Sequence, residues 1–506
     1  MVSRIISYTP LGLEAIPVQV EVDAGRGLPG LSIIGLPDQT IKEAKERVRT
    51  AILNSQFLLP SQRITVNLAP AGLKKEGGVF DLPIALGILA AIKQLNAATL
   101  APIAAVGELA LDGRVRPVAG ILPMALTARQ RGQTLMIPAE NLHEASLVKG
   151  LSLVPVSSLQ EAVDILTEQQ SFLACRPLDR RANEQERVID FSDVKGQSHA
   201  KRAIEIAVAG RHHLLFIGPP GSGKTLLAQR IPTVCPALSY EESIAVTAIH
   251  SVAGLIKETG LLGSRPFRAP HHTASSIALI GGGPYPKPGE LSLAHHGVLF
   301  LDELPEFHRD AIESLRQPLE EGVVRIARAK RSLTFPAECL LVAAMNPCPC
   351  GYLTVTRGRC RCSSRAIQTY LGKISGPLLD RIDLHVEVPA LSFDALSSSA
   401  AGDTSEAMHA RIVKAIRRQQ KRSKTSPPVL NGSLQQRQLR ALCSLNAEAR
   451  KLLKEAMQEL GLSARSYDKI LKIARTIADL SGTEEILPEH IAEAINYRAL
   501  DRQLWM

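Results

Sequence analysis

The sequence is poor in aromatic residues: phenylalanine, tryptophan and tyrosine make up 4% of its 506 residues, and there is one tryptophan. Recognition of nucleic-acid bases by stacking is therefore unsupported. The sequence also lacks an apolar run of bilayer length, since the longest, residues 82–92, contains Pro83 and Gly87 and stops at Lys93. Its first residues have no apolar core of signal-peptide length. We expect a cytoplasmic protein without membrane contact, whose eight cysteines are thiols or metal ligands rather than disulfides.

The length predicts several domains, because 506 residues exceed what one hydrophobic core covers. Two stretches have the composition of linkers: residues 176–189 are highly charged, and residues 392–406 are rich in serine and alanine. The net charge of +10 permits a polyanionic partner without requiring one. The predicted division is an N-terminal domain at 1–170, a charged linker at 171–189, a nucleotide domain at 190–390, a second linker at 391–407 and a helical domain at 408–506.

Two motifs indicate nucleotide hydrolysis. The first fits G-x-x-x-x-G-K-[ST] and lies between an apolar strand and a helix, so its backbone N–H groups and the helix N-terminus can cradle phosphates. The second is an apolar strand that ends in Asp302 and Glu303, two carboxylates suited to holding Mg²⁺ and polarising water. Together they favour hydrolysis of ATP or GTP over binding alone. The first motif consists of Gly218, Pro219, Pro220, Gly221, Ser222, Gly223, Lys224 and Thr225.

Residues 193–197, Asp-Val-Lys-Gly-Gln, complete a resemblance to AAA+ ATPases, in which this segment lies against the adenine. The resemblance implies that Lys224 reaches the β- and γ-phosphates of ATP. It also implies that Thr225 binds Mg²⁺, that Asp302 holds the metal through water, and that Glu303 orients the attacking water. Phosphoryl transfer needs mainly positioning and charge stabilisation, which these groups supply.

Three further residues resemble catalytic parts of that family. Asn346 ends the next apolar strand and resembles the sensor of the γ-phosphate or attacking water; a turn residue is the alternative. Arg381 resembles an arginine finger given to a neighbouring subunit, and an ion pair with Asp380 or Asp383 is its alternative. Arg465 opens a helix and resembles a lid arginine that senses nucleotide; a solvated residue in a first helical turn is the alternative. If both arginine assignments hold, the active sites are shared between subunits, and the family expectation is a homohexamer.

A long string of residues narrows the resemblance. It reads Arg-Pro-Phe-Arg-Ala-Pro-His-His-Thr at 265–273, three glycines at 281–283, and Pro-Lys-Pro-Gly-Glu-Leu-Ser-Leu-Ala-His-His-Gly at 286–297. It is similar to the magnesium-chelatase-related branch of AAA+ ATPases, and the N-terminal domain narrows this to the competence-type (ComM/YifB) members. That resemblance implies a helicase-like DNA motor, using ATP and Mg²⁺ on single-stranded or branched DNA, that promotes branch migration during recombination of taken-up DNA.

Four histidines in that string, His271, His272, His295 and His296, raise the alternative of a metal site. Adjacent imidazoles do not readily bind one ion, and no carboxylate stands at helical spacing as in H-E-x-x-H. We expect these side chains to form hydrogen bonds instead.

Residues 321–335 are predicted to form a hairpin whose tip carries Arg328, Lys330 and Arg331. In related helicases a hairpin at this place lines the pore and binds the phosphate backbone, which gives a contact independent of sequence. A solvated basic turn is the alternative.

Four cysteines, Cys348, Cys350, Cys360 and Cys362, fall within 15 residues shortly after Asn346. Four thiolates could bind a structural zinc ion tetrahedrally and close a loop that lacks apolar residues. The C-x-C spacing is tighter than the usual C-x₂-C, so free or redox-active thiols remain the alternative.

Residues 64–82 and 107–120 look like the proteolytic domain of Lon-type proteases, which use a serine–lysine dyad. On this sequence the serine position falls on Val79 and the lysine position on Leu122, and neither residue can perform that chemistry. We expect the fold without the peptidase.

The predicted fold class is α/β: an AAA+ P-loop αβα core with a C-terminal helical lid, preceded by an α+β Lon-protease-like (ribosomal S5 domain 2-like) domain. Helices are expected at 446–460, with Asn446 as N-cap, and at 463–480, and strands at 64–68 and 104–111. The function favoured is an ATP-driven DNA motor. A chelatase-type ATPase that remodels a protein partner is the alternative.

Overall fold

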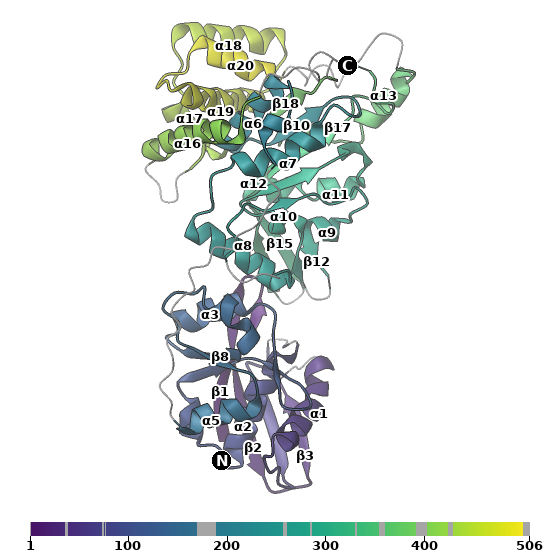
Figure 1. Ribbon diagram of the computed structural model, residues 1–506. Coiled ribbons are helices and arrows are strands. Elements are labelled where there is room, and N and C mark those ends of the chain that lie inside the picture. The colour runs from purple at the N-terminus through teal and green to yellow at the C-terminus, as the bar shows by residue number, and fades with distance from the viewer. Residues whose placement is uncertain are drawn as a thin grey trace. The chain divides into compact units, whose positions relative to one another are not determined.

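The chain forms two compact units, residues 1–183 with 240–263 and residues 184–239 with 264–506 (Figure 1). The computed structural model describes residues 2–35, 39–72, 75, 77–168, 189–256, 261–283, 286–328, 331–353, 360–390, 402–423 and 429–498. Residues 171–188 of the first predicted linker and 391–401 of the second lie outside these ranges. Among the described helices, none combines the length and apolarity that a bilayer span requires.

The first unit is built on a seven-stranded mixed sheet with the order β3-β4-β2-β1-β5-β8-β9. β1 pairs antiparallel with β2, and β2 with β4, while the remaining neighbours are parallel. The strands are β1 (Val2–Leu11), β2 (Glu14–Gly25), β3 (Gly30–Ile34), β4 (Arg63–Ala69), β5 (Ile103–Ala105), β8 (Thr134–Pro138) and β9 (Leu153–Val156), with a small ribbon of β6 (Glu108–Leu109) and β7 (Val115–Arg116). The helices are α1 (Gln39–Asn54), α2 (Asp81–Ala91), α3 (Ile121–Gln130), α4 (Leu142–Ala145) and α5 (Leu159–Glu168).

Helix α2 is the centre of this unit. All of its residues are buried, as expected for a helix that is apolar on every side. Gly87 lets it approach β2 closely, because a Cβ there would fall 2.8 Å from Cγ2 of Val22. Val79, just before α2, and Leu122, in α3, are buried in the same core. The two positions of the Lon dyad are therefore occupied by core side chains, and the absence of peptidase activity stays a prediction.

Helix α8 (Tyr240–Ala253) belongs to the first unit although it follows the phosphate-loop helix in the chain. The sequence places residues 240–263 within the nucleotide domain. In the structure, Ala248 joins the first unit's core, the Tyr240 hydroxyl donates to the Leu147 carbonyl at 2.9 Å, and Ser251 hydrogen-bonds to Glu144. Small and apolar residues form the buried face of α8, and this face packs on α3.

The second unit contains a five-stranded parallel sheet with the order β11-β14-β17-β10-β18. Its central strands are fully buried apolar runs, as is typical of a parallel sheet covered on both faces. The sheet strands are β11 (Phe267–Arg268), β14 (Val298–Leu301), β17 (Leu340–Met345), β10 (Leu214–Ile217) and β18 (Leu384–Glu387). Smaller ribbons are formed by β12 (Gly281–Gly282) with β13 (Lys287–Pro288) and by β15 (Val323–Arg328) with β16 (Arg331–Pro336). The helices are α6 (Ser198–Gly210), α7 (Lys224–Val234), α9 (Ser276–Ile280), α10 (Glu290–Leu293), α11 (Arg309–Glu313), α12 (Arg316–Glu321), α13 (Ser364–Leu371) and α14 (Gly376–Leu379).

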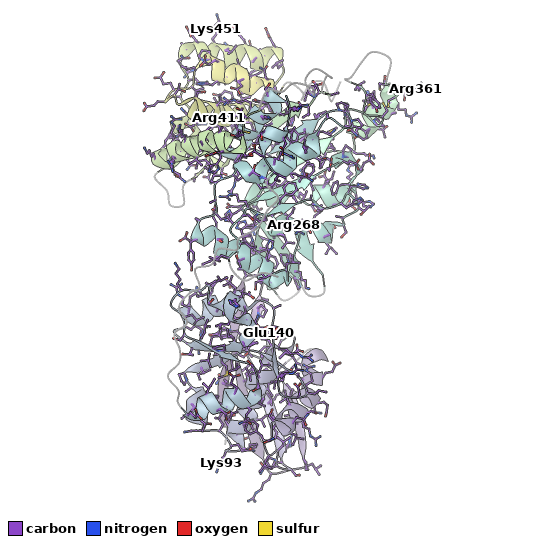
Figure 2. All side chains as sticks on the ribbon, viewed as in Figure 1. Lys93, Glu140, Arg268, Arg361, Arg411 and Lys451 are labelled. Atoms are coloured by element: carbon purple, nitrogen blue, oxygen red, sulfur yellow. The ribbon has the colours of Figure 1, made fainter. Side chains whose placement is uncertain are left out.

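A helical lid completes the second unit. It consists of α16 (Ser405–Arg422), α17 (Gln436–Leu442), α18 (Ala447–Glu459), α19 (Ala464–Ser481) and α20 (Pro488–Asn496). Residues 405–407, which the sequence places in the linker, form the first turn of α16, because the Thr404 hydroxyl caps it by accepting from the Ala407 N–H at 3.2 Å. Arg411 of α16, labelled in Figure 2, pairs with Glu205 of α6 at 2.5 Å and so connects the lid to α6.

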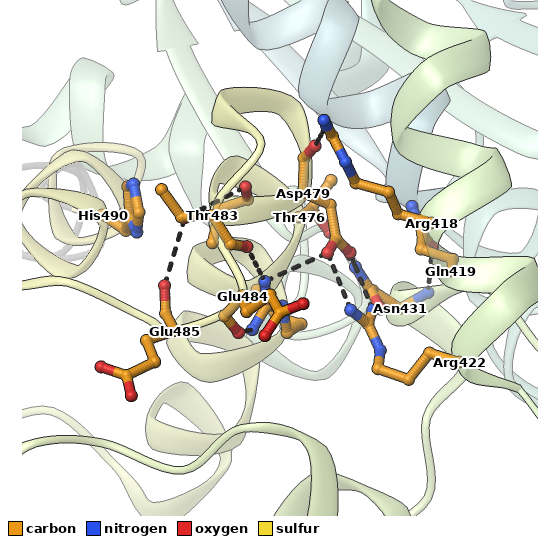
Figure 3. Close-up of polar contacts among 12 residues, drawn as sticks. Arg418, Gln419, Arg422, Asn431, Thr476, Asp479, Thr483, Glu484, Glu485 and His490 are labelled. Carbon is orange, nitrogen blue, oxygen red and sulfur yellow. Dashed lines mark hydrogen bonds and ion pairs between the residues drawn. The ribbon is translucent and has the colours of Figure 1, made fainter.

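Asp479 is the polar centre of the lid (Figure 3). Its carboxylate is 1% exposed and accepts two hydrogen bonds from Arg422, both at 2.8 Å, and one from Asn431 at 2.8 Å. Arg475 of α19 donates to the same carboxylate at 3.1 Å. The partners thus come from α16, α19 and the turn that follows α16, and both oxygens of this buried charge are hydrogen-bonded. The network fixes α16 against α19.

A candidate nucleotide site and a four-cysteine cluster

The phosphate-loop motif forms the turn between β10 and α7. Gly221 and Gly223 have φ of 75° and 91°, the left-handed region that glycine adopts without strain. Lys224 is the first residue of α7, and its side chain is buried. The loop therefore directs its backbone and the N-terminus of α7 toward one point, as phosphate binding requires.

The ammonium group of Lys224 lies at the centre of this site. Its Nζ donates to the carbonyls of Gly218 at 2.7 Å and Pro219 at 2.9 Å, and to Oδ1 of Asn346 at 3.2 Å. Burial lowers its pKa, although the nearby charge of Asp302 acts in the opposite direction. The structure thus joins the lysine of the first motif to the asparagine that follows β17.

The second motif meets the first at the same edge of the sheet. The Thr225 hydroxyl donates to Oδ2 of Asp302 at 2.7 Å, and the Glu303 backbone N–H donates to Oδ1 of Asp302 at 2.9 Å. Glu303 has a φ of 52°, an uncommon conformation for a residue other than glycine and one that clusters at functional sites. The two neighbouring oxygens of Thr225 and Asp302 are the hard ligands that Mg²⁺ prefers.

His272 contributes a contact that the sequence did not predict. Its Nδ1 lies 3.3 Å from Oε2 of Glu303. The residue follows β11, which pairs with β14, the strand that ends before Asp302. The sequence suggests only metal binding or hydrogen bonding for the histidine doublets. The contact with Glu303 depends on the order of the strands, which the sequence does not give.

The other histidine doublet has a structural role. His295 Nδ1 accepts the backbone N–H of Glu338 at 3.1 Å, and burial lowers the pKa of His295 to about 3, so the ring is neutral. The hydrogen-bonding role predicted for the histidines is therefore seen at His295. In the first doublet, by comparison, the ring centroids of His271 and His272 lie 4.1 Å apart.

The two arginines have partners outside the cluster around Lys224. Nη2 of Arg381 pairs with Glu320 at 2.5 Å, and its Nη1 donates to the Pro377 carbonyl at 3.1 Å. The intrachain ion pair weighed for Arg381 is present, but with Glu320 rather than an adjacent aspartate. Arg465 is 73% exposed and lies 3.5 Å from Asp380. A role for either arginine in catalysis stays a prediction.

The predicted hairpin is present as β15 and β16, which pair antiparallel with Arg328 opposite Arg331. Val324 and Phe335 anchor it in the core. Lys330 and the side chains of Arg328 and Arg331 lie outside the described residues, so their contact with DNA stays a prediction.

The four cysteines after Asn346 lie together. Their Sγ atoms are all within 4.8 Å of one another, with Cys348 3.3 Å from Cys350 and 3.7 Å from Cys360. The C-x-C spacing therefore brings neighbouring thiols together rather than separating them. Over the described ranges, no other group of three or more histidine, cysteine or acidic side chains could hold a metal ion. The cluster, which also includes Cys362, could hold one.

The second unit has a five-stranded parallel sheet and a helical lid. A phosphate loop follows β10, an Asp-Glu pair follows β14 and an asparagine follows β17. This combination defines an AAA+ ATPase module. Models of the magnesium chelatase subunit ChlI match residues 20–141 and 190–396, and the model of its C-terminal part matches residues 402–498.

Two relatives match nearly the whole chain, and a third matches part of it. Competence protein ComM of Haemophilus influenzae is 44% identical over 99% of this chain and 98% of its own length. The uncharacterised protein YifB of Escherichia coli is 43% identical over 98% of this chain and 96% of its own length. Lon protease 2 of Bacillus subtilis is 28% identical over 31% of this chain and 30% of its own length. The chain belongs to the ComM/YifB family of magnesium-chelatase-related AAA+ proteins, which are ATPases.

Proposed function

We propose that this protein is an ATP-driven DNA motor that acts as a homohexameric ring and promotes branch migration during recombination of DNA taken up by the cell. The observation that carries the ATPase part is the meeting of Lys224, Thr225, Asp302, Glu303 and Asn346 at the carboxyl edge of one parallel sheet. Ligands bind at this edge in open α/β sheets.

Each side chain has a defined task in ATP hydrolysis. The Lys224 ammonium neutralises charge on the β- and γ-phosphates, and the Asn346 amide, which it contacts, positions the γ-phosphate or the attacking water. Glu303 orients that water and accepts its proton, while His272 holds the carboxylate from the adjacent strand. Thr225 and Asp302 would hold Mg²⁺, which supplies charge stabilisation on the phosphate oxygens.

Hydrolysis at subunit interfaces requires a cation from the neighbouring chain. Arg381 is proposed to supply it, because an arginine finger stabilises the charge of the transferring phosphoryl group. Its ion pair with Glu320, which is 66% exposed, would have to be exchanged for the phosphate of the neighbouring subunit. Arg465 is proposed to contact the nucleotide bound to its own chain from the lid.

DNA as the partner is supported by charge and by relatives. The net charge is +10, and the β15–β16 hairpin carries Arg328, Lys330 and Arg331 at its tip. Contacts of such residues to phosphates are independent of sequence, as a motor that moves along DNA needs. The competence role is taken from the printed name of the Haemophilus relative. Zinc in the four-cysteine cluster belongs to the same proposal, because four thiolates are its usual structural ligands.

A branch-migration assay tests this proposal. The wild-type protein with ATP should convert a synthetic branched DNA into its migrated products, and Lys224→Ala should not. A variant with Arg328→Ala and Arg331→Ala should lose DNA binding while keeping basal ATP turnover. The matched control carries Lys451→Ala and Lys454→Ala on α18, which removes the same charge from an exposed helix (Lys451 is labelled in Figure 2). Equal losses in both double variants would argue against the hairpin.

A second candidate function is remodelling of a protein partner by a chelatase-type ATPase. The matches to models of a magnesium chelatase subunit favour it. This function requires ATP turnover that is unchanged by DNA and changed by a protein partner. Measuring the turnover of one preparation with each of them therefore distinguishes the two candidate functions.

A further inference from the structure

The four thiols have the spacing of ligands to one shared ion. Sulfurs at about 2.3 Å from a tetrahedral zinc lie about 3.8 Å from one another. The observed separations are 3.3 Å for Cys348–Cys350, 3.7 Å for Cys348–Cys360 and 3.6 Å for Cys350–Cys360, with Cys362 within 4.8 Å of each. A disulfide would join the cysteines in pairs with sulfurs about 2 Å apart. A single four-coordinate site fits all four side chains with small adjustments.

The residues between the cysteines offer little else to hold them. The cysteine loop, residues 347–363, has few apolar side chains, and within its described parts, 347–353 and 360–363, it forms turns without a helix or strand. Cys348 is buried, whereas Arg361, labelled in Figure 2, is exposed. A loop that cannot build a core gains its folding free energy from a metal ion.

Both ends of the cysteine loop reach the nucleotide site. Asn346, which precedes the loop, accepts a hydrogen bond from Lys224 at 3.2 Å. Burial raises the pKa of Tyr370, in the helix that follows the loop, to about 12, and the nearby backbone of Asn346 acts in the opposite direction. The two ends of the loop therefore lie near the residue that contacts the phosphate-loop lysine.

The cysteine loop also packs directly on the phosphate loop. Gly351, between the second and third cysteines, has a φ of 83°, and a Cβ at this position would lie 2.4 Å from Cδ of Pro220. Its N–H donates to the Cys348 carbonyl at 2.9 Å, which ties it to the cluster. No L-amino acid with a side chain fits at Gly351 without moving one loop or the other.

We propose that one zinc ion bound by Cys348, Cys350, Cys360 and Cys362 holds the cysteine loop against the phosphate loop and so sets the affinity of the site for ATP. Two contacts connect the cysteine loop to the phosphate loop: Gly351 with Pro220, and Asn346 with Lys224. Through them, a metal that fixes the cysteine loop would also fix the residues that bind the nucleotide. The inference rests on the proposed role of the phosphate loop, but it does not depend on the nature of the DNA or protein partner.

The first experiment tests whether the four cysteines bind zinc. The full chain, purified without chelator, should contain one zinc per chain by elemental analysis, with four thiols that become reactive to a thiol reagent only after the metal is removed. Cys350→Ser with Cys360→Ser should lose the zinc. The matched control is Cys235→Ser, which lies outside the cluster and whose hydroxyl can keep the hydrogen bond of the Cys235 thiol to the Ile231 carbonyl. A wild-type chain without metal, or with the four cysteines paired as disulfides, would overturn the proposal.

The coupling is tested by ATP binding in the absence of DNA. Removal of zinc should raise the dissociation constant for a non-hydrolysable ATP analogue about tenfold, within the usual range of coupling between two sites, and added zinc should restore it. Gly351→Ala keeps all four cysteines, so the variant should retain zinc. Its dissociation constant for the ATP analogue should nevertheless rise by a similar factor. Its control is Gly150→Ala, where φ is 79° but a Cβ meets nothing within 4 Å. Unchanged affinity in zinc-free protein and in Gly351→Ala would overturn the coupling.

The same titration separates this inference from the proposed function. Lys224→Ala should bind zinc normally and fail to bind the analogue. If Lys224→Ala bound the analogue as tightly as the wild type, the phosphate-loop assignment itself would fail.

Discussion

Lys469 in helix α19 forms an ion pair with Asp383, with 3.1 Å between Nζ and Oδ1, and so joins the lid to the segment that carries Arg381. Lys469 also donates to the backbone carbonyls of Asp380 and Ile382. Arg465 stands one turn earlier on the same helix. The two arginines proposed to act on nucleotide are therefore attached to one connected unit.

Asp383→Asn should destabilise the second unit. Burial by itself would raise the pKa of Asp383, but the charge of Lys469 and the hydrogen bond from His212 lower it well below its usual range. Because the folded pKa lies below the unfolded one, the stabilisation is complete at neutral pH and is lost as the pH falls below about 4, where an unfolded aspartate is protonated. We expect a loss of about 3 kcal/mol in the free energy of unfolding, measured by urea titration.

The pH series provides the control for this variant. The difference between wild type and Asp383→Asn should be the same at pH 8 and pH 5.5 and should shrink below pH of about 4. A difference that grew as the pH fell would show that the ion pair is not its source.

Glu303→Gln should keep ATP binding and stop hydrolysis. The amide preserves the size of the side chain but cannot accept a proton from water, so turnover should fall about a hundredfold or more. The dissociation constant for ATP should stay within about twofold, because Lys224 and the loop amides are unchanged. Turnover near the wild-type rate would remove Glu303 from the catalytic step.

His272→Ala should lower turnover with little change in ATP affinity. The imidazole lies 3.3 Å from the Glu303 carboxylate, and its loss frees that side chain to adopt other rotamers. We expect a decrease in kcat of between about tenfold and a hundredfold, since a misplacement of about 1 Å can cost about a hundredfold. The comparison variant is His271→Ala, whose Nδ1 bonds locally to Thr273. Equal effects of both substitutions would point to the loop fold rather than to Glu303.

Arg381→Ala should lower ATP turnover by about a thousandfold, as expected for loss of an arginine finger. Subunits that keep Arg381 but carry Glu303→Gln should restore part of the activity when mixed with it. Wherever such a subunit gives its Arg381 to the site of an Arg381→Ala subunit, that interface has both Glu303 and the arginine. Glu320→Gln breaks the intrachain ion pair while keeping the arginine, so it separates a structural role from a catalytic one. Full activity of pure Arg381→Ala would exclude the finger.

Local motifs made much of the second unit predictable. Asn446 caps α18 as predicted, accepting from the Ala449 N–H at 2.8 Å, and α19 ends at Ser481 with Gly482 as its C-cap. The hairpin at β15 and β16 is also seen, because its alternation of apolar residues is a local signal. In the first unit, the strand expected at 104–111 is divided between β5 and β6.

Tertiary relationships were the part that the sequence could not provide. Nothing local in residues 240–263 distinguishes a helix that packs on the nucleotide domain from one that packs on the N-terminal unit. The partners of Arg381 and Glu303, which are Glu320 and His272, are distant in sequence and meet through the arrangement of the sheet and its helices. Charge pairs of this kind depend on topology, whereas caps and phosphate loops depend on a few neighbouring residues.

If ATP hydrolysis drives movement on DNA, the presence of DNA should change ATP turnover. This is measured with single-stranded, duplex and branched DNA across a salt series. We expect turnover to rise with DNA, most with the preferred substrate, and the stimulation to fall steeply with salt because the contacts are to phosphates. The Glu303→Gln variant, which should not hydrolyse ATP, gives the background rate of the turnover assay. Turnover indifferent to every DNA at low salt would contradict the motor, and remodelling of a protein partner would replace it.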